Sequence, residues 1–311
     1  MVILLTGGTG FVGRHIVNIL VKDPNNTIYI LSRNKVVNGF KANHKNVFYT
    51  SISYEDVDEL SIFFKQVNPS HILHLASSKS RNKLNELNYE LFIKDISVDI
   101  NIINAALTIK TLSAFIYLGS ADMFMPSKKN ITEKSNFRPT NSYALKKAII
   151  TNLILEFRTS KNFPGVVAIP SLIYGPMQKE EMFLPALIKS LIKNKSFNMS
   201  HGEQYRDYIF IDDFVDAIYL LIIKNIQTKP ILLIGSGESV KIIDVAHKVL
   251  NFFDSKSKSL IKVGNKELVN SSVDYNFDIS KSSNYLNWKP KYSFDKGLIK
   301  TIDYFMVENN A

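Results

Sequence analysis

Short apolar runs alternate with longer amphipathic stretches along the first 235 residues of the chain. The apolar runs predict strands at 2–6, 27–32, 47–52, 71–76, 114–120, 165–171 and 230–235. Apolar residues at helical spacing predict helices that start near Phe11, cover about 90–108, contain Tyr143 and follow Asp213. Strands and helices that alternate at this spacing build βαβ units. The pattern therefore predicts an α/β fold with a doubly wound parallel sheet.

Two segments do not follow this alternation. Residues 175–208 and 236–311 contain several prolines and the single tryptophan, but no regular succession of strands and helices. We therefore expect a larger domain formed by residues 1–174 and 209–235. A smaller C-terminal lobe should be formed by the two irregular segments.

Two of the predicted helical segments, 91–106 and 143–157, are apolar around most of the helix circumference. Packing on one face of a sheet buries only a single stripe of a helix. We therefore expect a homodimer in which these helices pack against a second copy of the chain. A thick hydrophobic core within one chain is the alternative explanation.

Composition narrows the class of protein. Of the 311 residues, 45% are hydrophobic, which is enough for a packed core. No apolar run reaches the about 18 to 20 residues that cross a bilayer, and no leader segment precedes the first strand, so we expect neither membrane insertion nor export. The absence of cysteine excludes disulfides and thiolate metal sites and fits the reducing cytoplasm. Six scattered histidines form no His-x-x-x-His pair, so no metal site is expected.

The formal net charge is +10. Proteins that bind nucleic acids gather their basic residues into a patch or stripe, whereas the lysines here are spread along the chain. We therefore expect no nucleic-acid partner. A generally basic surface is the simplest explanation of the charge, and an anionic small substrate is the second.

The first predicted strand runs directly into TGGTGFVG, residues 6–13. Gly7, Gly10 and Gly13 permit a tight turn, close approach of a pyrophosphate to the backbone, and close packing of the next helix. Phe11 and Val12 open that helix. A purely structural turn is the alternative, but the position between strand one and a helix favours dinucleotide binding. The sheet is therefore expected to be of the Rossmann type.

The second predicted strand ends in YILSRN. Proteins that prefer NAD carry an acidic residue there, which binds the ribose hydroxyls. Ser32 and Arg33 stand in this place instead. A hydroxyl and a guanidinium suit the 2′-phosphate of NADP, so NADP(H) is the expected cofactor. An exposed arginine without a ligand is the alternative.

The segment NSYALKKAI, residues 141–149, places Tyr143 and Lys147 four residues apart on one helix face. Ser120 ends the strand AFIYLGS, at the edge where open α/β sheets bind ligands. Each residue alone has a structural explanation, as a packed tyrosine, a surface lysine or a strand-end serine. The predicted fold brings all three toward one edge of the sheet.

With these motifs the chain resembles the extended short-chain dehydrogenase/reductase family, the group of nucleotide-sugar epimerases, dehydratases and reductases. The resemblance covers nearly the whole chain. It rests on TGGTGFVG, HILHLA, Ser120, Tyr143-x-x-x-Lys147, IYGP (173–176), GEQYRDYIFIDD (202–213), IGSGESV (234–240) and LNWKP near the C-terminus. Each motif is weak alone, and jointly they are specific.

The resemblance implies a role for each of the three residues. Lys147 holds the nicotinamide ribose, and its charge should lower the pKa of Tyr143. Ser120 hydrogen-bonds the reacting oxygen, and Tyr143 gives or takes its proton. Further cofactor contacts are expected at Ile52, Leu75, Ala76, Ser77 and Pro170.

The C-terminal lobe is expected to bind a nucleoside-diphosphate sugar. The resemblance places Arg206 on the diphosphate, which suits a guanidinium fork. An internal ion pair with a neighbouring aspartate is the alternative. Tyr174, Phe183 and Met199 are expected to line the sugar and base pockets, although core packing explains such side chains equally well.

Three reactions are open to a member of this group. The 4,6-dehydratases usually carry an acidic pair or a glutamate just after the catalytic hydroxyl, where this chain has Ala121 and Asp122. The 4-epimerases usually have an acid at the end of strand two, where this chain has Ser32 and Arg33. The expected reaction is therefore NADPH-dependent reduction of the C4 keto group of a 4-keto-6-deoxy or 3,6-dideoxy hexose nucleotide, as in CDP-paratose and abequose synthases.

In this interpretation Tyr143 protonates the alkoxide at C4, and Asp122 orients a sugar hydroxyl. The expected setting is deoxysugar biosynthesis for O-antigen or another surface polysaccharide. The alternatives are an NAD-dependent nucleotide-sugar epimerase or 4,6-dehydratase, and, in another class, a non-catalytic NADP-binding regulator. Such a regulator should lack Ser120, Tyr143 or Lys147, and the chain has all three.

Overall fold

The computed structural model describes residues 1–33, 44–77, 81–124, 130–224, 229–265 and 274–310. The chain divides into two compact units. Unit 1 comprises Met1–Met125, Asn136–Ile169 and Val215–Leu232, and unit 2 comprises Pro126–Ser135, Pro170–Phe214 and Leu233–Ala311.

A parallel sheet forms the centre of unit 1. Its strands are β1 (Val2–Thr6), β2 (Thr27–Ser32), β3 (Val47–Ser51), β4 (His71–His74), β5 (Ala114–Leu118), β6 (Gly165–Pro170) and β10 (Ile231–Ile234). They lie in the order β10-β6-β5-β4-β1-β2-β3. The chain proceeds outward in one direction from β1 and then in the other from β4. Sheets of this kind bind ligands where the order reverses, so β1 and β4 flank the expected binding edge.

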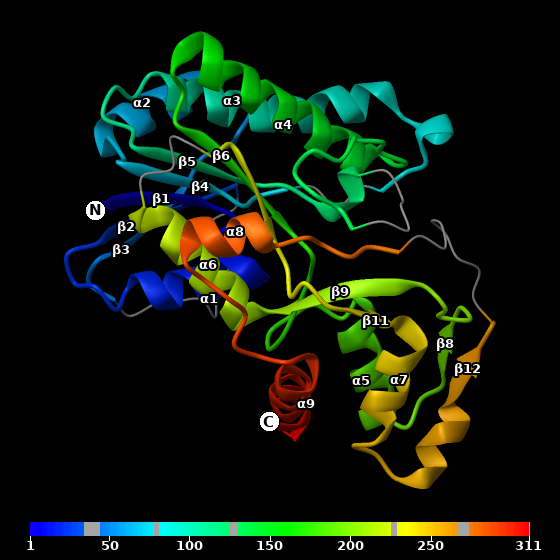
Figure 1. Cartoon of the computed structure of the whole chain (residues 1–311). Coiled ribbons are helices and arrows are strands. Elements are labelled where there is room, and N and C mark those ends of the chain that lie inside the picture. Colours follow the sequence, from blue (N-terminus) through cyan, green and yellow to red (C-terminus); the bar gives the residue numbers. More distant parts are fainter. Residues whose placement is uncertain (34–43, 78–80, 125–129, 225–228, 266–273, 311) are drawn as a thin grey trace. The chain divides into compact units, whose positions relative to one another are not determined.

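Helices cover both faces of this sheet. On one face lie α2 (Val57–Val67), α3 (Tyr89–Leu107) and α4 (Ser142–Lys161), and on the other lie α1 (Phe11–Leu20) and α6 (Ile211–Ile223) (Figure 1). Because both faces are covered, the strands are continuous apolar runs, and Ile3, Leu4 and Leu5 of β1 are fully buried. The doubly wound α/β fold predicted from the sequence is confirmed.

Helix α4 begins at a defined point because Asn141 caps it. The Asn141 side chain accepts a hydrogen bond from the backbone N–H of Ala144 at 2.9 Å. At the other end Asn162 adopts the left-handed conformation that terminates many helices, with φ of 51°. The cap fixes Tyr143 and Lys147 in the first two turns of α4.

The residues of unit 2 that the structure describes form two small sheets and four helices. One sheet has β7 (Leu172–Tyr174), β9 (Tyr205–Phe210) and β11 (Ser239–Lys241), and the other has β8 (Phe197–Met199) and β12 (Ile261–Val263). The helices are α5 (Phe183–Ile192), α7 (Ile242–Leu250), α8 (Ser280–Leu286) and α9 (Phe294–Asn310). Short 3₁₀ turns in the chain lie at Leu84–Glu86, Ala121–Met123 and Ser255–Leu260.

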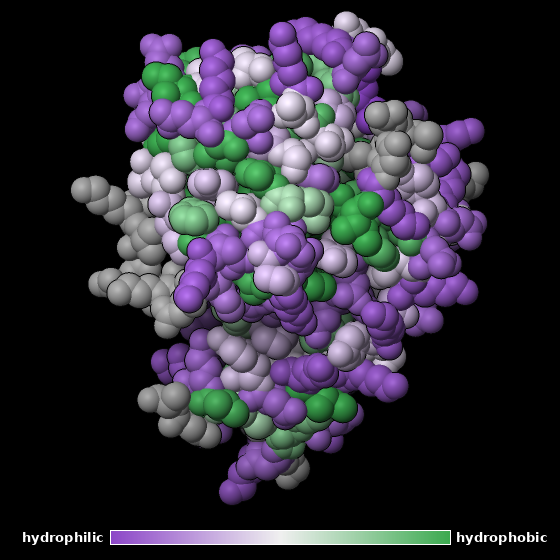
Figure 2. All heavy atoms as spheres, turned by 90° about the vertical axis from the view of Figure 1, so that its left-hand side faces the viewer, coloured by the Kyte–Doolittle hydropathy of each residue, from purple (hydrophilic) through white to green (hydrophobic). Residues whose placement is uncertain are grey.

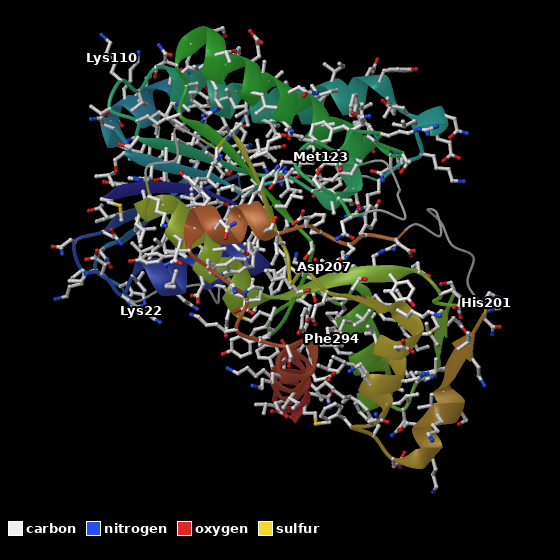
Figure 3. The ribbon with its side chains drawn as sticks, viewed as in Figure 1. Lys22, Lys110, Met123, His201, Asp207 and Phe294 are labelled. Carbon is white, nitrogen blue, oxygen red and sulfur yellow. The ribbon has the colours of Figure 1, made fainter. Side chains whose placement is uncertain are left out.

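A buried carboxylate ties β9 to the turn after β10 within unit 2. Asp207, labelled in Figure 3, accepts hydrogen bonds from the backbone N–H of Ser236 at 2.8 Å and from that of Gly237 at 3.1 Å. The Ser236 hydroxyl donates to it as well, at 2.8 Å. These bonds compensate for removing the carboxylate from water.

The predicted strands agree with the observed ones to within two residues, but the boundary between the units differs from the expected one at residue 174. Residues 172–174 form β7, which pairs with β9 of unit 2 and not with the large sheet. Ile131 forms a β-bridge with Phe277, so the segment around Ile131 also belongs to unit 2. Periodicity did not reveal these pairings, because they join short segments that lie far apart in the sequence.

The hydropathy and charge of the surface indicate whether the described residues could contact a membrane or a nucleic acid. None of the helices that the structure describes is long and apolar enough to cross a membrane. Hydrophilic residues predominate on the face in Figure 2, and hydrophobic ones form small separate groups. Lys22 and Lys110 lie at the periphery of unit 1 (Figure 3). This agrees with basic residues that are spread over the surface.

Candidate active site

Ser120 stands just beyond the carboxyl end of β5. Its side chain is buried, and its oxygen accepts a hydrogen bond from the backbone N–H of Asp122 at 3.2 Å. This bond caps the 3₁₀ turn Ala121–Met123. The hydroxyl is thereby held at the ligand-binding edge of the sheet.

Tyr143 and Lys147 of α4 meet Ser120 at this edge. Ser120 lies close enough to Tyr143 for its hydroxyl to favour the phenolate form of that tyrosine. The Lys147 ammonium lies 5.8 Å from the centre of the Tyr143 ring and donates a 2.7 Å hydrogen bond to the backbone oxygen of Leu118. The fold thus brings Ser120 to two side chains of α4 that follow it by more than 20 residues in the sequence.

Burial has the largest effect on the ionisation of Tyr143 and Lys147. It raises the pKa of Tyr143, although Arg81 and Ser120 act in the opposite direction. It lowers the pKa of Lys147 to about 7. The charge of Lys147 was expected to lower the pKa of Tyr143 before burial is counted, and burial outweighs such an effect. Spacing along a helix does not report how deeply the helix is buried. At neutral pH Tyr143 is a neutral hydroxyl that can give a proton.

Arg81 is a residue of this site that the sequence did not reveal. Its guanidinium forms an ion pair with Asp122 at 2.9 Å and lies 4.8 Å from the centre of the Tyr143 ring. The Arg81 side chain is 53% exposed, so it can meet a ligand that arrives from solvent. No motif marks a single arginine after β4, and only the fold brings it beside Tyr143.

The glycine-rich turn between β1 and α1 forms a cradle of bare backbone. Gly7 has φ of 72°, and a Cβ there would lie 2.7 Å from the backbone nitrogen of Ala76. A Cβ on Gly13 would overlap the backbone oxygen of Gly7. The backbone N–H of Gly10 closes the turn by donating to the same oxygen at 3.0 Å. Glycine is therefore required at Gly7 and Gly13 by contacts that the structure shows.

This cradle fits the pyrophosphate of a dinucleotide. No side chain caps the start of α1, so its first backbone N–H groups, around Phe11 and Val12, face an anion-binding position. Beyond β4, the backbone N–H of Ala76 donates to the Thr6 hydroxyl at 3.3 Å. The buried Ser77 hydroxyl has no hydrogen-bond partner among the described residues, and is a polar group that a ligand can satisfy.

The remaining expected cofactor contacts lie at or just beyond the carboxyl ends of β2, β3 and β4. Ser32 ends β2, and the exposed Arg33 follows it with its guanidinium 6.0 Å from the centre of the Tyr54 ring. Ile52 is buried and donates its backbone N–H to the oxygen of Ser32 at 3.0 Å. Leu75 continues from β4, where its N–H donates to the oxygen of Thr6 at 3.1 Å.

Of the residues expected to contact substrate, Asp122 belongs to unit 1. The others, Tyr174, Phe183, Met199 and Arg206, belong to unit 2, as does Pro170 at the end of β6. Tyr174 is buried in an aromatic cluster, and its hydroxyl donates to the backbone oxygen of Phe294 at 2.9 Å (Phe294 is labelled in Figure 3). This packing agrees with the alternative explanation of Tyr174 as a core residue. Its role as a substrate contact stays a prediction.

The other three residues of this group differ in exposure. Met199 is buried, whereas Phe183 is half-buried and packs edge to face against Phe197 at 5.7 Å between ring centres. The Arg206 guanidinium lies 4.9 Å from the centre of the Tyr275 ring. It also donates to the backbone oxygen of Tyr205 at 2.8 Å. Their contacts with a substrate are predictions as well.

The residues that the structure describes include no group of three histidine, aspartate or glutamate side chains able to hold a metal ion. The residues at the site are a hydroxyl pair, an ammonium, a carboxylate and a guanidinium. They are suited to proton transfer and to binding an anionic ligand.

Comparison with known proteins shows the family to which the chain belongs. The model of the NAD dependent epimerase/dehydratase family matches residues 3–235, which is well over half of the chain. The chain belongs to this family. The expected resemblance to the epimerase/dehydratase group is therefore confirmed.

Individual relatives within the family are more distant. The dTDP-D-glucose 4,6-dehydratase of Homo sapiens is 26% identical, over 97% of this chain and 89% of that protein. The CDP-abequose synthase of Salmonella typhimurium is also 26% identical, over 95% of each chain. Relatives named for two different reactions are thus equally similar in sequence.

Solved structures share the fold. The dTDP-glucose 4,6-dehydratase of Bacillus anthracis, solved in complex with NAD, has a TM-score of 0.87 at 18% identity and covers 100% of this chain and 98% of its own. The UDP-glucose 4-epimerase of Thermotoga maritima, solved with UDP-glucose, has a TM-score of 0.86 at 20% identity, with coverages of 99% and 100%. At these identities the likeness shows the fold alone.

The glycine cradle provides a first test. Gly13→Ala should weaken the binding of a reduced nicotinamide dinucleotide at least about tenfold, because the new methyl group overlaps the Gly7 oxygen. Gly10→Ala should have a smaller effect, since its Cβ would lie 3.2 Å from that oxygen. Fluorescence titration gives both dissociation constants, and thermal unfolding shows whether each variant is folded. A folded Gly13→Ala protein with unchanged affinity would contradict this assignment.

The Arg81 guanidinium provides a second test. Arg81→Met should raise the pKa of Tyr143 further, because it removes a positive charge that favours the phenolate. The pKa is measured by ultraviolet difference titration against a Tyr143→Phe variant in the same background. Lys83→Met, which removes an exposed lysine from the same loop, should leave the Tyr143 titration unchanged. Equal titrations in wild type and Arg81→Met would show that the guanidinium does not act on this phenol.

Proposed function

We propose that this protein reduces the C4 keto group of a nucleoside-diphosphate 4-keto-6-deoxy or 3,6-dideoxy hexose, with NADPH as the reductant. The ion pair between Arg81 and Asp122, beside a neutral Tyr143, carries the proposal. A 4,6-dehydratase needs a carboxylate free to take a proton from the sugar. Here the carboxylate is bound to a guanidinium and the preceding residue is Ala121, whereas reduction needs only a proton donor.

The cofactor proposal rests on the end of β2. Ser32 and Arg33 offer a hydroxyl and an exposed guanidinium, which suit the 2′-phosphate of NADP better than the bare ribose hydroxyls of NAD. The glycine cradle would hold the pyrophosphate, and Lys147 the nicotinamide ribose. When bound, the reduced dinucleotide supplies a hydride.

The proton comes from the chain's own residues. Tyr143 donates the proton of its hydroxyl to the oxygen at C4, which balances the hydride gained by the carbon. Ser120 holds that oxygen through its hydroxyl, and the charge of Lys147 stabilises the tyrosinate that remains. The Arg81–Asp122 pair orients hydroxyl groups of the sugar.

The substrate proposal rests on unit 2 and on a relative. A guanidinium such as that of Arg206 binds a diphosphate through paired hydrogen bonds. The 26% identity to a CDP-abequose synthase supports a deoxyhexose nucleotide as substrate. The corresponding setting is cytoplasmic deoxysugar synthesis for O-antigen or another surface polysaccharide.

A 4,6-dehydratase is the second candidate. The similarity to dTDP-glucose 4,6-dehydratases favours it, and Asp122 occupies the place of their usual glutamate. That enzyme would act on an intact nucleoside-diphosphate hexose without net consumption of NADPH. A non-catalytic NADP-binding regulator would show neither activity.

The test is an assay of NADPH oxidation with CDP- and dTDP-4-keto-6-deoxyglucose. We expect oxidation that requires the sugar nucleotide and falls at least about a hundredfold in Tyr143→Phe, because the proton donor is removed. Arg33→Ala should raise the KM for NADPH and leave that for NADH nearly unchanged. Dehydration of an intact hexose nucleotide, with no oxidation of NADPH, would replace the reductase by the dehydratase.

We further propose that the protein forms a homodimer through α3 and α4. Leu91 and Ile93 of α3 are each 63% exposed, and Ile149 of α4 is 38% exposed. Exposed apolar side chains on the two helices suit burial against a second copy. Because they lie on neighbouring helices of unit 1, one interface can include both.

Light scattering after size exclusion tests the dimer. Wild type should have twice the mass of the 311-residue chain, and Leu91→Lys/Ile93→Lys should shift toward one chain, because two buried charges oppose association. Ile62→Lys on α2, where the side chain is 57% exposed, is the matched control and should remain dimeric. A monomeric wild type would contradict this proposal.

A further inference from the structure

A cluster of fully buried ionisable groups lies next to the proposed catalytic Lys147, and the proposed chemistry does not use it. Its members, here called the buried cluster, are His74 of β4, Asp99 of α3 and Lys146 of α4. Their exposed fractions are 0%, 0% and 1%. Ionised groups are rarely removed from water in this way unless they are paired.

Short contacts join the buried cluster. His74 Nε2 lies 2.7 Å from Asp99 Oδ1, and the other carboxylate oxygen lies 3.5 Å from Lys146 Nζ. Lys146 also donates to Asp95 at 3.1 Å, and Asp95 is 23% exposed. Asp99 is therefore the fully buried anion of the cluster, held between an imidazole and an ammonium.

The imidazole is neutral and connects Asp99 to the glycine-rich turn. Burial lowers the pKa of His74. A neutral ring that donates through Nε2 to Asp99 accepts at Nδ1, which lies 2.6 Å from the Thr6 hydroxyl. Thr6 immediately precedes Gly7 of the cradle. The chain of contacts fixes the orientation of the carboxylate.

The Tyr117 ring contacts both Lys147 and His74, the partner of Asp99. The Lys147 ammonium lies 4.3 Å from the centre of the Tyr117 ring, and the His74 ring centre lies 5.6 Å from it. Tyr117 is completely buried, and the nearby charge of Asp99 adds to the burial that raises its pKa well above its ordinary value. A ring face and a buried carboxylate both stabilise an ammonium.

We propose that Asp99 is a positioning residue that supplies the buried negative charge required by the two adjacent ammonium groups of Lys146 and Lys147. Lys146 competes with Lys147 for that charge. The negative charge of Asp99 favours protonated Lys147, and the positive charge of Lys146 disfavours it. The balance of these two charges sets whether Lys147 is protonated at neutral pH. This inference rests on the proposed function only in its use of Lys147 as the charged partner of Tyr143.

The groups that face Lys147 act in both directions. Asp99 and Asp95 of α3 favour its protonated form, whereas Lys146 of the same helix and burial oppose it. Tyr143 of α4, Tyr117 of β5 and His74 of β4 face it as neutral groups. Asp122 and Arg81 form their own ion pair farther along the site. Asp99 and Lys146 are thus the pair whose removal should act on Lys147 with opposite signs.

The experiment compares the pH dependence of kcat/KM for NADPH oxidation in wild type, Asp99→Asn and Lys146→Met. Activity that needs charged Lys147 falls as pH rises through the pKa of Lys147, near 7. We expect the alkaline limb to move to lower pH in Asp99→Asn and to higher pH in Lys146→Met, each by about one unit or more. A purely structural role predicts lower activity in both variants without opposite shifts.

Unfolding provides a readout that does not need activity. Between pH 7 and the ordinary lysine pKa of about 10.4, the unfolded chain binds the Lys147 proton and the folded protein does not, so the free energy of unfolding rises with pH. This rise should begin at lower pH in Asp99→Asn and at higher pH in Lys146→Met. The profile is measured by urea unfolding at a series of pH values.

The two readouts separate the failure of each proposal. Opposite shifts in the unfolding profiles without NADPH oxidation would uphold the role of Asp99 and overturn the proposed reaction. Active enzymes whose profiles do not move would overturn the role of Asp99 alone.

If Asp99→Asn does not fold, Asp99→Asn/Lys146→Met, which removes both charges, replaces it. The pH profile of this double variant should lie closer to the wild-type profile than the profile of Lys146→Met does. A double variant whose profile coincides with that of Lys146→Met would contradict the proposal.

Discussion

The burial of two ammonium groups side by side at the start of α4 is the constraint on which the site depends. Removing an ammonium from water costs several kcal/mol unless nearby groups compensate. Lys147 is compensated by the Leu118 oxygen and the Tyr117 ring. Lys146 is compensated by Asp95 and Asp99. Because these partners come from β5 and α3, the charge of α4 is stabilised only when the central layers of unit 1 are packed together.

The parallel sheet explains why these groups meet. The carboxyl ends of β1, β4 and β5 lie at one edge, and each contributes one part of the site. β1 leads into the glycine cradle, β4 carries His74, and β5 leads to Ser120. The Asn141 cap sets where α4 starts, and therefore which of its residues face that edge. Cofactor binding and proton donation thus both depend on how β1, β4 and β5 are aligned in the sheet.

The sequence allowed much of this arrangement to be predicted, and for a physical reason. Strands buried on both faces produce continuous apolar runs, and backbone crowding at Gly7 and Gly13 excludes other residues, so both leave a local pattern. Arg81 left none, because its contacts with Asp122 and Tyr143 are long-range. The effect of burial on the Tyr143 pKa could not be predicted for the same reason, since burial depends on the whole fold. Short pairings such as β7 with β9 escaped detection because three residues carry too little periodicity.

The path of the reducing hydrogen distinguishes a 4-ketoreductase from a dehydratase. Wild-type protein is incubated with a 4-keto-6-deoxyhexose nucleotide and NADPH that carries deuterium at the transferred position, and the sugar is analysed by mass spectrometry and NMR. A 4-ketoreductase places one deuterium at C4 of the product for each NADPH oxidised. A product without deuterium at C4, or conversion of an intact hexose nucleotide with no use of NADPH, would contradict the proposed reduction.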